Sequence, residues 1–84
     1  MKYEIIYTKR AVKDLSKLDS PTKERIRQTL ERYAKAPLSY ARKMIDPALG
    51  TYRFRIGEYR AIFDVEGNEL VILRIGHRRE IYRK

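Results

Sequence analysis

Three arginines in two short alternating segments are the residues of this chain best suited to bind an anion. Residues 52–56 carry Arg53 and Arg55, residues 59–63 carry Arg60, and Gly57-Glu58 joins the two segments. A two-residue connection with glycine first is typical of a type II′ hairpin turn. That turn sets a register in which Arg55 lies opposite Arg60 and Arg53 lies opposite Ile62.

Alternation along these strands gathers the arginines on one surface, here called the arginine face. Because successive strand side chains point to opposite faces, Arg53, Arg55 and Arg60 share it. The other face carries Tyr52, Phe54, Ala61 and Phe63. Like charges directly opposite each other are unfavourable, so a sheet that tolerates them is suited to bind an anion. Guanidinium groups favour phosphate, because they stay charged and donate paired hydrogen bonds.

A simpler alternative is that the arginine face is a solvated surface without a ligand. Glu58 in the turn and Asp64 near the far end of the same face offset part of the repulsion. Lys and Glu in alternation would solubilise a sheet with less repulsion than three arginines, which favours the binding interpretation.

A second candidate site follows the last predicted strand, in residues 77–84. His77 is the only histidine, and an ordinary histidine pKa of about 6.5 allows proton transfer near neutral pH. It is expected to emerge beside the arginine face, although a lone histidine is more often structural or exposed. Tyr82 could stack on a base. The alternative, which the sequence favours, is a hydrophobic lid formed by Tyr82 and Ile81.

Length and composition predict a single domain, residues 1–84, with a strong preference for acidic partners. Hydrophobic residues make up 43% of the chain, enough for a core, and 20 Lys and Arg against 11 Asp and Glu give a net charge of +9. Such an excess favours nucleic acid, an acidic protein or an anionic membrane as the binding partner.

The chain has no cysteine, no signal-peptide pattern and no membrane-spanning apolar run, so cytoplasmic residence is expected. No Gly-rich phosphate loop, HExxH motif or Cys/His cluster is present, and we predict neither a metal nor a cofactor.

Two helices are expected after a first strand at residues 2–7. Thr8 can cap a helix that runs to Leu18, and Ser20 can cap a second helix that runs to Lys35, with Pro21 in its first turn. The inward positions are Ala11, Val12, Leu15 and Leu18 in the first helix and Ile26, Leu30, Tyr33 and Ala34 in the second. The first helix also carries a basic stripe, which is either a solvated face or part of an RNA footprint. Pro37 ends the second helix, and residues 38–50 are expected to form a loop.

The remaining residues are expected to form a three-strand meander whose last strand, residues 69–76, is central because it is apolar on both faces. The first strand is placed beside it. Leu70 and Ile72 are assigned to the apolar face, and Val71, Leu73 and Ile75 to the arginine face. The predicted fold class is therefore α+β, in the order β-α-α-β-β-β, with an antiparallel sheet covered by an N-terminal αα-hairpin.

Three stretches of the chain resemble the RelE/ParE superfamily of bacterial and archaeal toxins from type II toxin–antitoxin modules. They are residues 7–15 (Tyr-Thr-Lys-Arg-Ala-Val-Lys-Asp-Leu), 52–63 (Tyr-Arg-Phe-Arg-Ile-Gly-Glu-Tyr-Arg-Ala-Ile-Phe) and 76–82 (Gly-His-Arg-Arg-Glu-Ile-Tyr). The combination spans nearly the whole chain. The family fold, a small α+β domain with two N-terminal helices over a sheet, agrees with the element order predicted from the residues.

The resemblance implies the activity of the RelE branch, an endoribonuclease that cleaves mRNA in the ribosomal A site without a metal. A nucleotide 2′-hydroxyl attacks the adjacent phosphate, and cations stabilise the charge of the phosphorane. On matching positions, Arg53 and Arg60 would bind the phosphate, Arg78 would assist the leaving oxygen or clamp the next phosphate, and Tyr82 would stack on the substrate. Arg55 and His77 are weaker catalytic candidates. The expected RNA- and ribosome-binding residues are Lys9, Arg10, Lys13, Lys17, Arg79 and Arg83.

One departure from the family pattern and two alternative functions remain. Some RelE members carry two lysines where this chain reads Thr51-Tyr52-Arg53, so the general base is not assigned, and His77 is a possible substitute.

The ParE branch shares the fold but inhibits DNA gyrase, and a degenerate toxin would only bind antitoxin and operator DNA. The resemblance further implies an acidic RelB-like antitoxin as partner, with operator DNA bound only through the antitoxin complex and no membrane.

Overall fold

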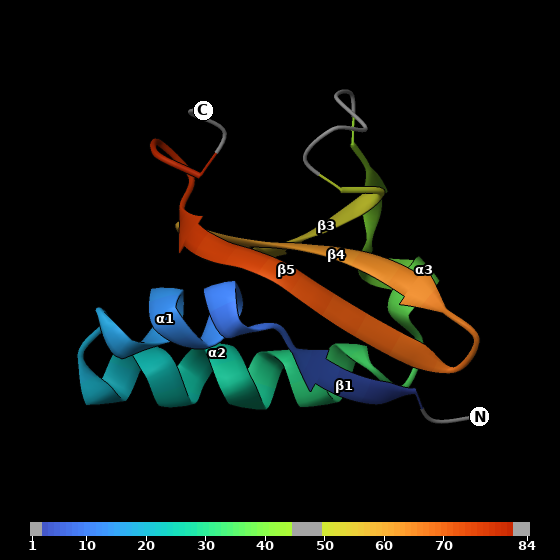
Figure 1. Ribbon diagram of the computed structural model, residues 1–84, viewed down its shortest axis with the longest axis horizontal. Helices are drawn as coiled ribbons and strands as arrows, with labels where there is room; N and C mark the ends of the chain where they lie inside the picture. Colours follow the sequence, from blue (N-terminus) through green and yellow to red (C-terminus); the bar gives the residue numbers. More distant parts are fainter. Residues whose placement is uncertain (1–2, 45–49, 82–84) are drawn as a thin grey trace.

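The computed structural model describes residues 3–44 and 50–81, which form a five-stranded sheet with helices against one face (Figure 1). The elements in chain order are β1 (Glu4–Tyr7), α1 (Lys9–Ser16), α2 (Ser20–Tyr33), α3 (Pro37–Tyr40), β2 (Arg42–Lys43), β3 (Tyr52–Ile56), β4 (Tyr59–Glu66) and β5 (Glu69–His77). The strand order across the sheet is β1-β5-β4-β3-β2. In Figure 1, α1 and α2 lie beneath the sheet, while β2 and residues 78–81 rise on its other side.

The α+β class, the meander and the αα-hairpin are confirmed, with two differences. β1 pairs with β5 in parallel, so the sheet is mixed rather than purely antiparallel; the long connection that a parallel pair needs is supplied by the rest of the chain. The segment predicted as a loop also contains α3 and β2. Pro37, predicted to end the second helix, is the first residue of α3, a position where a missing amide hydrogen costs nothing.

Side-chain caps begin both long helices, one of them at a different residue than predicted. Thr8 Oγ1 accepts a hydrogen bond from the Ala11 amide at 3.2 Å, as predicted. The second cap is Asp19, whose Oδ1 accepts from the Thr22 amide at 3.0 Å. Ser20 is therefore the first helical residue, and the prediction that it caps the helix was wrong. Asp19 takes the cap because its extended backbone precedes Ser20 and its carboxylate reaches the same amides.

The buried side of α1 also differs from the prediction at one position. Ala11, Asp14 and Leu15 are its buried residues, whereas Val12 is 54% exposed. The helix packs mainly on β5, and Val12 lies outside the stripe that this packing buries. Asp14 is buried on this side of the helix instead. Its Oδ2 accepts a hydrogen bond from the Ile75 amide of β5 at 3.0 Å.

The register of the β3–β4 hairpin agrees with the prediction. Arg55 lies opposite Arg60, and Arg53 lies opposite Ile62. Gly57 has φ of +60°, whereas Glu58, like every described non-glycine residue, does not have positive φ. A type II′ turn needs positive φ only at its first central residue and a type I′ turn needs it at both, so the turn fits type II′. The turn chemistry thus fixes which side chains share the arginine face.

A bulge between β4 and β5 changes the alternation of β5. Ile62 pairs with Arg74 and Phe63 pairs with Ile72, so Leu73 is an extra residue on β5. One extra residue turns every later side chain to the opposite face. Ile75 therefore lies in the core at 2% exposure, and its predicted place on the arginine face was wrong.

The core lies between the sheet and the helices. Phe54 and Phe63 stack with ring centroids 4.2 Å apart, and Ile26 and Leu30 of α2 are buried in the same cluster. Buried aromatic pairs of this kind stabilise by about 0.5–1.5 kcal/mol beyond the area they bury. The packing holds β3 and β4 as a rigid platform, whose other face carries the arginines. None of the helices found in residues 3–44 and 50–81 is long and apolar enough to cross a membrane.

Candidate functional site

A small pocket on the sheet face away from α1 and α2 is lined almost entirely by arginines. Its volume is about 130 Å³, and its lining residues are Tyr40, Arg42, Arg53, Arg55 and Arg60. We call it the arginine pocket. The three arginines of the predicted arginine face all line it, so the structure brings them together as the register requires. Arg42 and Tyr40 come from segments that were predicted to be loop.

Strand pairing places the pocket cations in two like-charged pairs. Arg55 lies opposite Arg60 across the β3–β4 ladder, and Arg42 lies opposite Arg53 across the β2–β3 ladder. Each pair is unfavourable in isolation, because opposed like charges repel across a ladder. The ion pairs found among the described residues involve Arg27, Arg74 and Arg78, and none of the four pocket arginines. The site is thus a concentration of positive charge suited to a multiply charged anion.

Arg60 is held at the hairpin turn by backbone acceptors. Its Nη1 donates to the Gly57 carbonyl oxygen at 2.9 Å and to the Tyr59 carbonyl oxygen at 2.8 Å. These bonds fix the guanidinium, and none of the ion pairs found in residues 3–44 and 50–81 gives it a carboxylate partner. Pre-oriented cations stabilise developing negative charge without reorganising, which is the property a catalytic cation needs.

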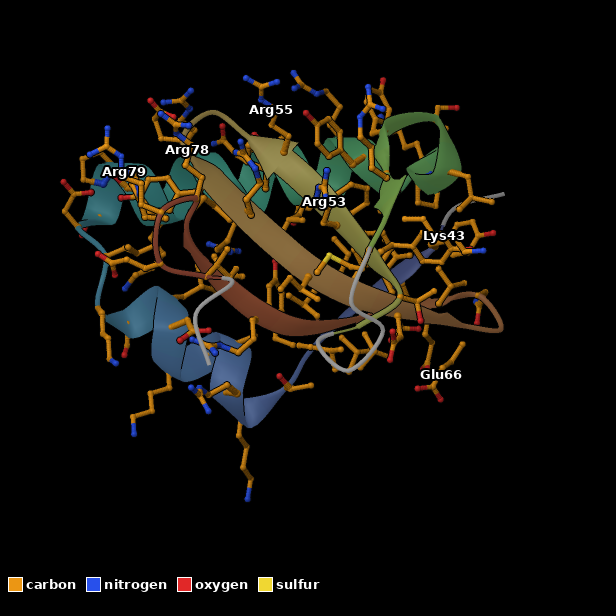
Figure 2. All side chains as sticks on the ribbon, turned by 90° about the horizontal axis from the view of Figure 1, so that it is seen from above. Lys43, Arg53, Arg55, Glu66, Arg78 and Arg79 are labelled. Carbon is orange, nitrogen blue, oxygen red and sulfur yellow. The ribbon has the colours of Figure 1, made fainter. Side chains whose placement is uncertain are left out.

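Arg78 approaches the same turn from the end of β5. Its Nε lies 2.7 Å from Glu58 Oε2, and its backbone amide donates to the Glu58 carbonyl oxygen at 2.8 Å. Figure 2 places Arg78 and Arg79 beyond the end of β5, and Arg53 and Arg55 on β3. Arg60 and Arg78, distant in sequence, are therefore both anchored to the turn Gly57-Glu58.

His77 lies on the other face of the sheet, apart from the arginine pocket. Its ring meets the Tyr59 ring edge-on at 5.6 Å, and its Nδ1 accepts from the Arg79 amide at 3.2 Å. It lines a second pocket with Asp14, Lys17 and others. The expectation that His77 emerges beside the arginine face was wrong, because the bulge at Leu73 reverses the alternation before the strand ends.

The other predicted site residues fall outside the arginine pocket. Three exposed cations, Lys9, Arg10 and Lys13, lie on α1, and the exposed Lys17 is its C-cap. This helix packs on the opposite side of the sheet. Arg79 is exposed just after β5. Tyr82 and Arg83 lie outside the described residues. Ile81, predicted to form a lid with Tyr82, is buried against Gly76.

Sequence reasoning missed both Arg42 and Tyr40, and a local signal exists only for Tyr40. Pro37 is a residue typical of a helix start, and the short helix it begins carries Tyr40. Arg42-Lys43 then pairs with β3 over only two residues, a length too short to give a recognisable alternation.

Comparison with known proteins identifies the family to which this chain belongs. The family model of the "ParE toxin of type II toxin-antitoxin system, parDE" matches residues 5–82. The chain therefore belongs to this family, which confirms the resemblance to the RelE/ParE superfamily and makes the chain a type II toxin–antitoxin toxin.

Two curated relatives of this chain are named as toxins. Toxin RelG of Mycobacterium tuberculosis is 33% identical over 91 aligned positions, covering 100% of both chains. Toxin RelE3 of Methanocaldococcus jannaschii is 29% identical over 83 positions, covering 94% of each. A solved structure, the toxin–antitoxin complex RelBE2 from M. tuberculosis, matches with a TM-score of 0.83 and 26% identity, over 93% of this chain and 100% of the other.

Proposed function

We propose that this toxin is a ribosome-dependent mRNA endoribonuclease that cleaves mRNA in the A site and so inhibits translation. The observation that carries the proposal is the arginine pocket, in which four guanidinium groups converge without a carboxylate partner among the described residues. The similarity to Toxin RelE3 and Toxin RelG supports it. The substrate class follows from the chemistry of the pocket, because phosphate accepts the paired hydrogen bonds of arginine.

The reaction that fits these cations is transesterification at one phosphate. The 2′-oxygen of a nucleotide bonds to the adjacent phosphorus, the bond from phosphorus to the 5′-oxygen breaks, and the products are a 2′,3′-cyclic phosphate and a 5′-hydroxyl end. The pocket cations bind the phosphorane more strongly than the ground state, because charge accumulates on its equatorial oxygens. Arg53 and Arg60 hold the scissile phosphate. Arg78 assists the departing oxygen or clamps the next phosphate.

Proton transfer is assigned to no described side chain of the pocket. Arginine hardly deprotonates at neutral pH, and His77 lies on the opposite face. In the proposal the 2′-hydroxyl proton leaves to water or to a ribosomal group, and the 5′-oxygen takes a proton from the same sources. General acid–base catalysis contributes about 10²–10⁴ in rate, so its supply by the ribosome would explain a requirement for ribosomes.

Cleavage of a defined mRNA with and without programmed ribosomes tests the proposal. The protein should cut within the A-site codon only when ribosomes are present, and Arg60→Ala should slow the cut by about 10²–10³, the usual loss for one transition-state donor. Arg27→Ala is the matched control, because Arg27 lies on α2 and pairs with Glu24. A folded protein that cuts no mRNA, or an Arg60→Ala variant as fast as Arg27→Ala, would overturn it.

The proposed partner is an acidic, partly disordered antitoxin that folds on the toxin. The net charge of +9 supports an acidic partner, and the RelBE2 relative was solved as a toxin–antitoxin complex. Such a peptide would cover basic surface and block access to the A site. Operator DNA would be bound only through this complex.

Gyrase inhibition is the second candidate function, because the matching family model is described as a ParE toxin. A DNA supercoiling assay with purified gyrase separates the two. Inhibition of supercoiling without any mRNA cleavage would favour the ParE-like function, and neither activity would indicate a degenerate toxin that acts only with its antitoxin.

A further inference from the structure

We infer that Tyr40 is a stacking platform for the nucleobase next to the phosphate held in the arginine pocket. The inference rests on the proposed function, because it names the base-binding element of the same site. An exposed aromatic ring and converging cations line one pocket here. Proteins that bind single-stranded nucleic acids combine the same two elements, since every base has a face that can stack.

The Tyr40 ring is held in a fixed plane before any ligand arrives. It stacks on Tyr33, with ring centroids 4.2 Å apart and an angle of 14° between the planes. Tyr33 is itself fixed, since its ring packs on Phe54 at 5.1 Å and its hydroxyl donates to the Arg55 carbonyl oxygen at 3.3 Å. A base added on the outer side of Tyr40 would extend this stack without ordering a mobile side chain, which lowers the entropic cost of binding.

The exposure of Tyr40 sets it apart from the aromatic residues of the core. Tyr40 is 47% exposed, whereas Phe54 and Phe63, which continue the same chain of ring contacts, are fully buried. Scattered apolar residues on a surface are ordinary, and Val12 and Leu38 are similarly exposed at 54% and 61%. Neither of those two lines the arginine pocket, and Tyr40 does.

The size of the pocket separates the place of the phosphate from that of the base. Pockets that enclose a small-molecule ligand usually measure about 300–1,000 Å³, and the arginine pocket measures about 130 Å³. It can receive a phosphate group between its guanidiniums but cannot enclose a whole nucleotide. The attached base would therefore lie outside the pocket, and Tyr40 is the one aromatic residue that lines it.

Binding of a short single-stranded RNA, measured by fluorescence anisotropy, tests the inference. A 2′-O-methyl strand prevents cleavage, and a strand of the same length with abasic sugars removes the stacking partner. Tyr40→Ala should weaken binding of the base-containing strand roughly 5- to 150-fold, the range for loss of one stacked base. It should leave binding of the abasic strand unchanged. Tyr40→Phe should bind both strands like the wild type.

Controls keep this outcome separate from the proposed function. Leu38→Ala changes an exposed apolar residue of the same short helix and should alter neither affinity. Equal affinity of Tyr40→Ala and wild type for the base-containing strand would overturn the inference alone, provided that Arg53→Ala still weakens both strands. Failure of the folded wild-type protein to bind either strand would overturn the inference together with the RNA-binding part of the proposed function.

Discussion

Arg78 and Glu58 are joined twice, through their side chains and through their backbones. Arg78 Nε lies 2.7 Å from Glu58 Oε2, and the Arg78 amide donates to the Glu58 carbonyl oxygen at 2.8 Å. The preceding residue of the turn, Gly57, supplies a carbonyl oxygen to Arg60. The hairpin turn therefore positions Arg60 and Arg78, which are far apart in the sequence. Among the ion pairs of the described residues, Glu58 is the one carboxylate partner of Arg78, and it would compete with a bound anion.

Glu58→Gln should bind RNA more tightly without a change in stability. Both side chains are substantially exposed, and exposed ion pairs contribute about 0–1 kcal/mol to folding. Removing one negative charge beside the cations should favour a phosphate by up to about 1 kcal/mol, or roughly fivefold in affinity. Anisotropy with the 2′-O-methyl strand measures the affinity, and urea denaturation measures the stability.

Glu66→Gln is the matched control for this change. Glu66 is the exposed last residue of β4, and Figure 2 shows it at the far end of the sheet from Arg78. The Glu66→Gln substitution changes the net charge of the chain by the same amount as Glu58→Gln. Because Glu66 lies far from Arg78, its effect on RNA affinity should be small. Weaker binding by Glu58→Gln than by Glu66→Gln would contradict the prediction, because Glu58 would then act by positioning Arg78.

Arg42→Ala should weaken RNA binding, make that binding less dependent on salt concentration, and slightly raise the stability of the fold. Arg42 faces Arg53 directly, and removal of an opposed like charge stabilises a sheet by up to about 1 kcal/mol. If Arg42 contacts one phosphate, the slope of log K against log salt concentration should become shallower by about 0.7. Titrations at several salt concentrations give this slope, with Arg27→Ala as control. A slope equal to that of Arg27→Ala would remove Arg42 from the site.

Asp14→Ala should destabilise the fold by about 1–3 kcal/mol, the cost of leaving buried polar groups unpaired. Asp14 is 8% exposed, and its Oδ2 accepts from the Ile75 amide at 3.0 Å and from Arg74 Nε at 2.9 Å. For a domain of this size that is a fall in Tm of roughly 4–8 °C per kcal/mol. Asp14→Asn keeps an acceptor for the Ile75 amide and should lose less. Thermal unfolding followed by circular dichroism measures both.

Glu24→Ala is the comparison for Asp14→Ala, because it removes a carboxylate from an exposed pair with Arg27. Such a surface change usually stays within about 0.5 kcal/mol. An equal fall in Tm for Asp14→Ala and Glu24→Ala would mean that the bonds of Asp14 to β5 contribute no more than a surface ion pair.

The hairpin that carries most of the pocket could be predicted from sequence, since its geometry is local. Gly57-Glu58 fixes the turn, the turn fixes the register, and the register places Arg53, Arg55 and Arg60 on one face. No packing information is needed for any of these steps.

The position of His77 could not be predicted, because it depends on how two strands fit together over their full length. Strict alternation from Ile72 would put His77 on the arginine face, and the one extra residue at Leu73 puts it on the core face. Arg42 was missed for a related reason. Its strand has two residues and exists only through its pairing with β3, so local propensity carries no sign of it.

Asp19 should make the stability of the fold depend on pH in the acid range. Its hydrogen bonds from Thr22 lower the pKa of the Asp19 carboxyl below its ordinary value of 3.8, since they favour the charged form. A carboxyl with a lowered pKa in the folded state stabilises above its unfolded pKa and loses that contribution as pH falls through the folded one. Asp19→Ala should therefore have a lower Tm than wild type at pH 6, and the difference should shrink below about pH 4.

Asp19→Asn separates the cap from its charge. Asparagine caps helices about as well as aspartate, so this variant should retain most of the wild-type Tm at pH 6. It has no carboxyl to titrate at this position, so its Tm should fall less than that of wild type between pH 5 and pH 3. Thermal unfolding of the three proteins across this range measures the effect, and parallel Tm curves for wild type and Asp19→Ala would show that the cap contributes no pH-dependent stability.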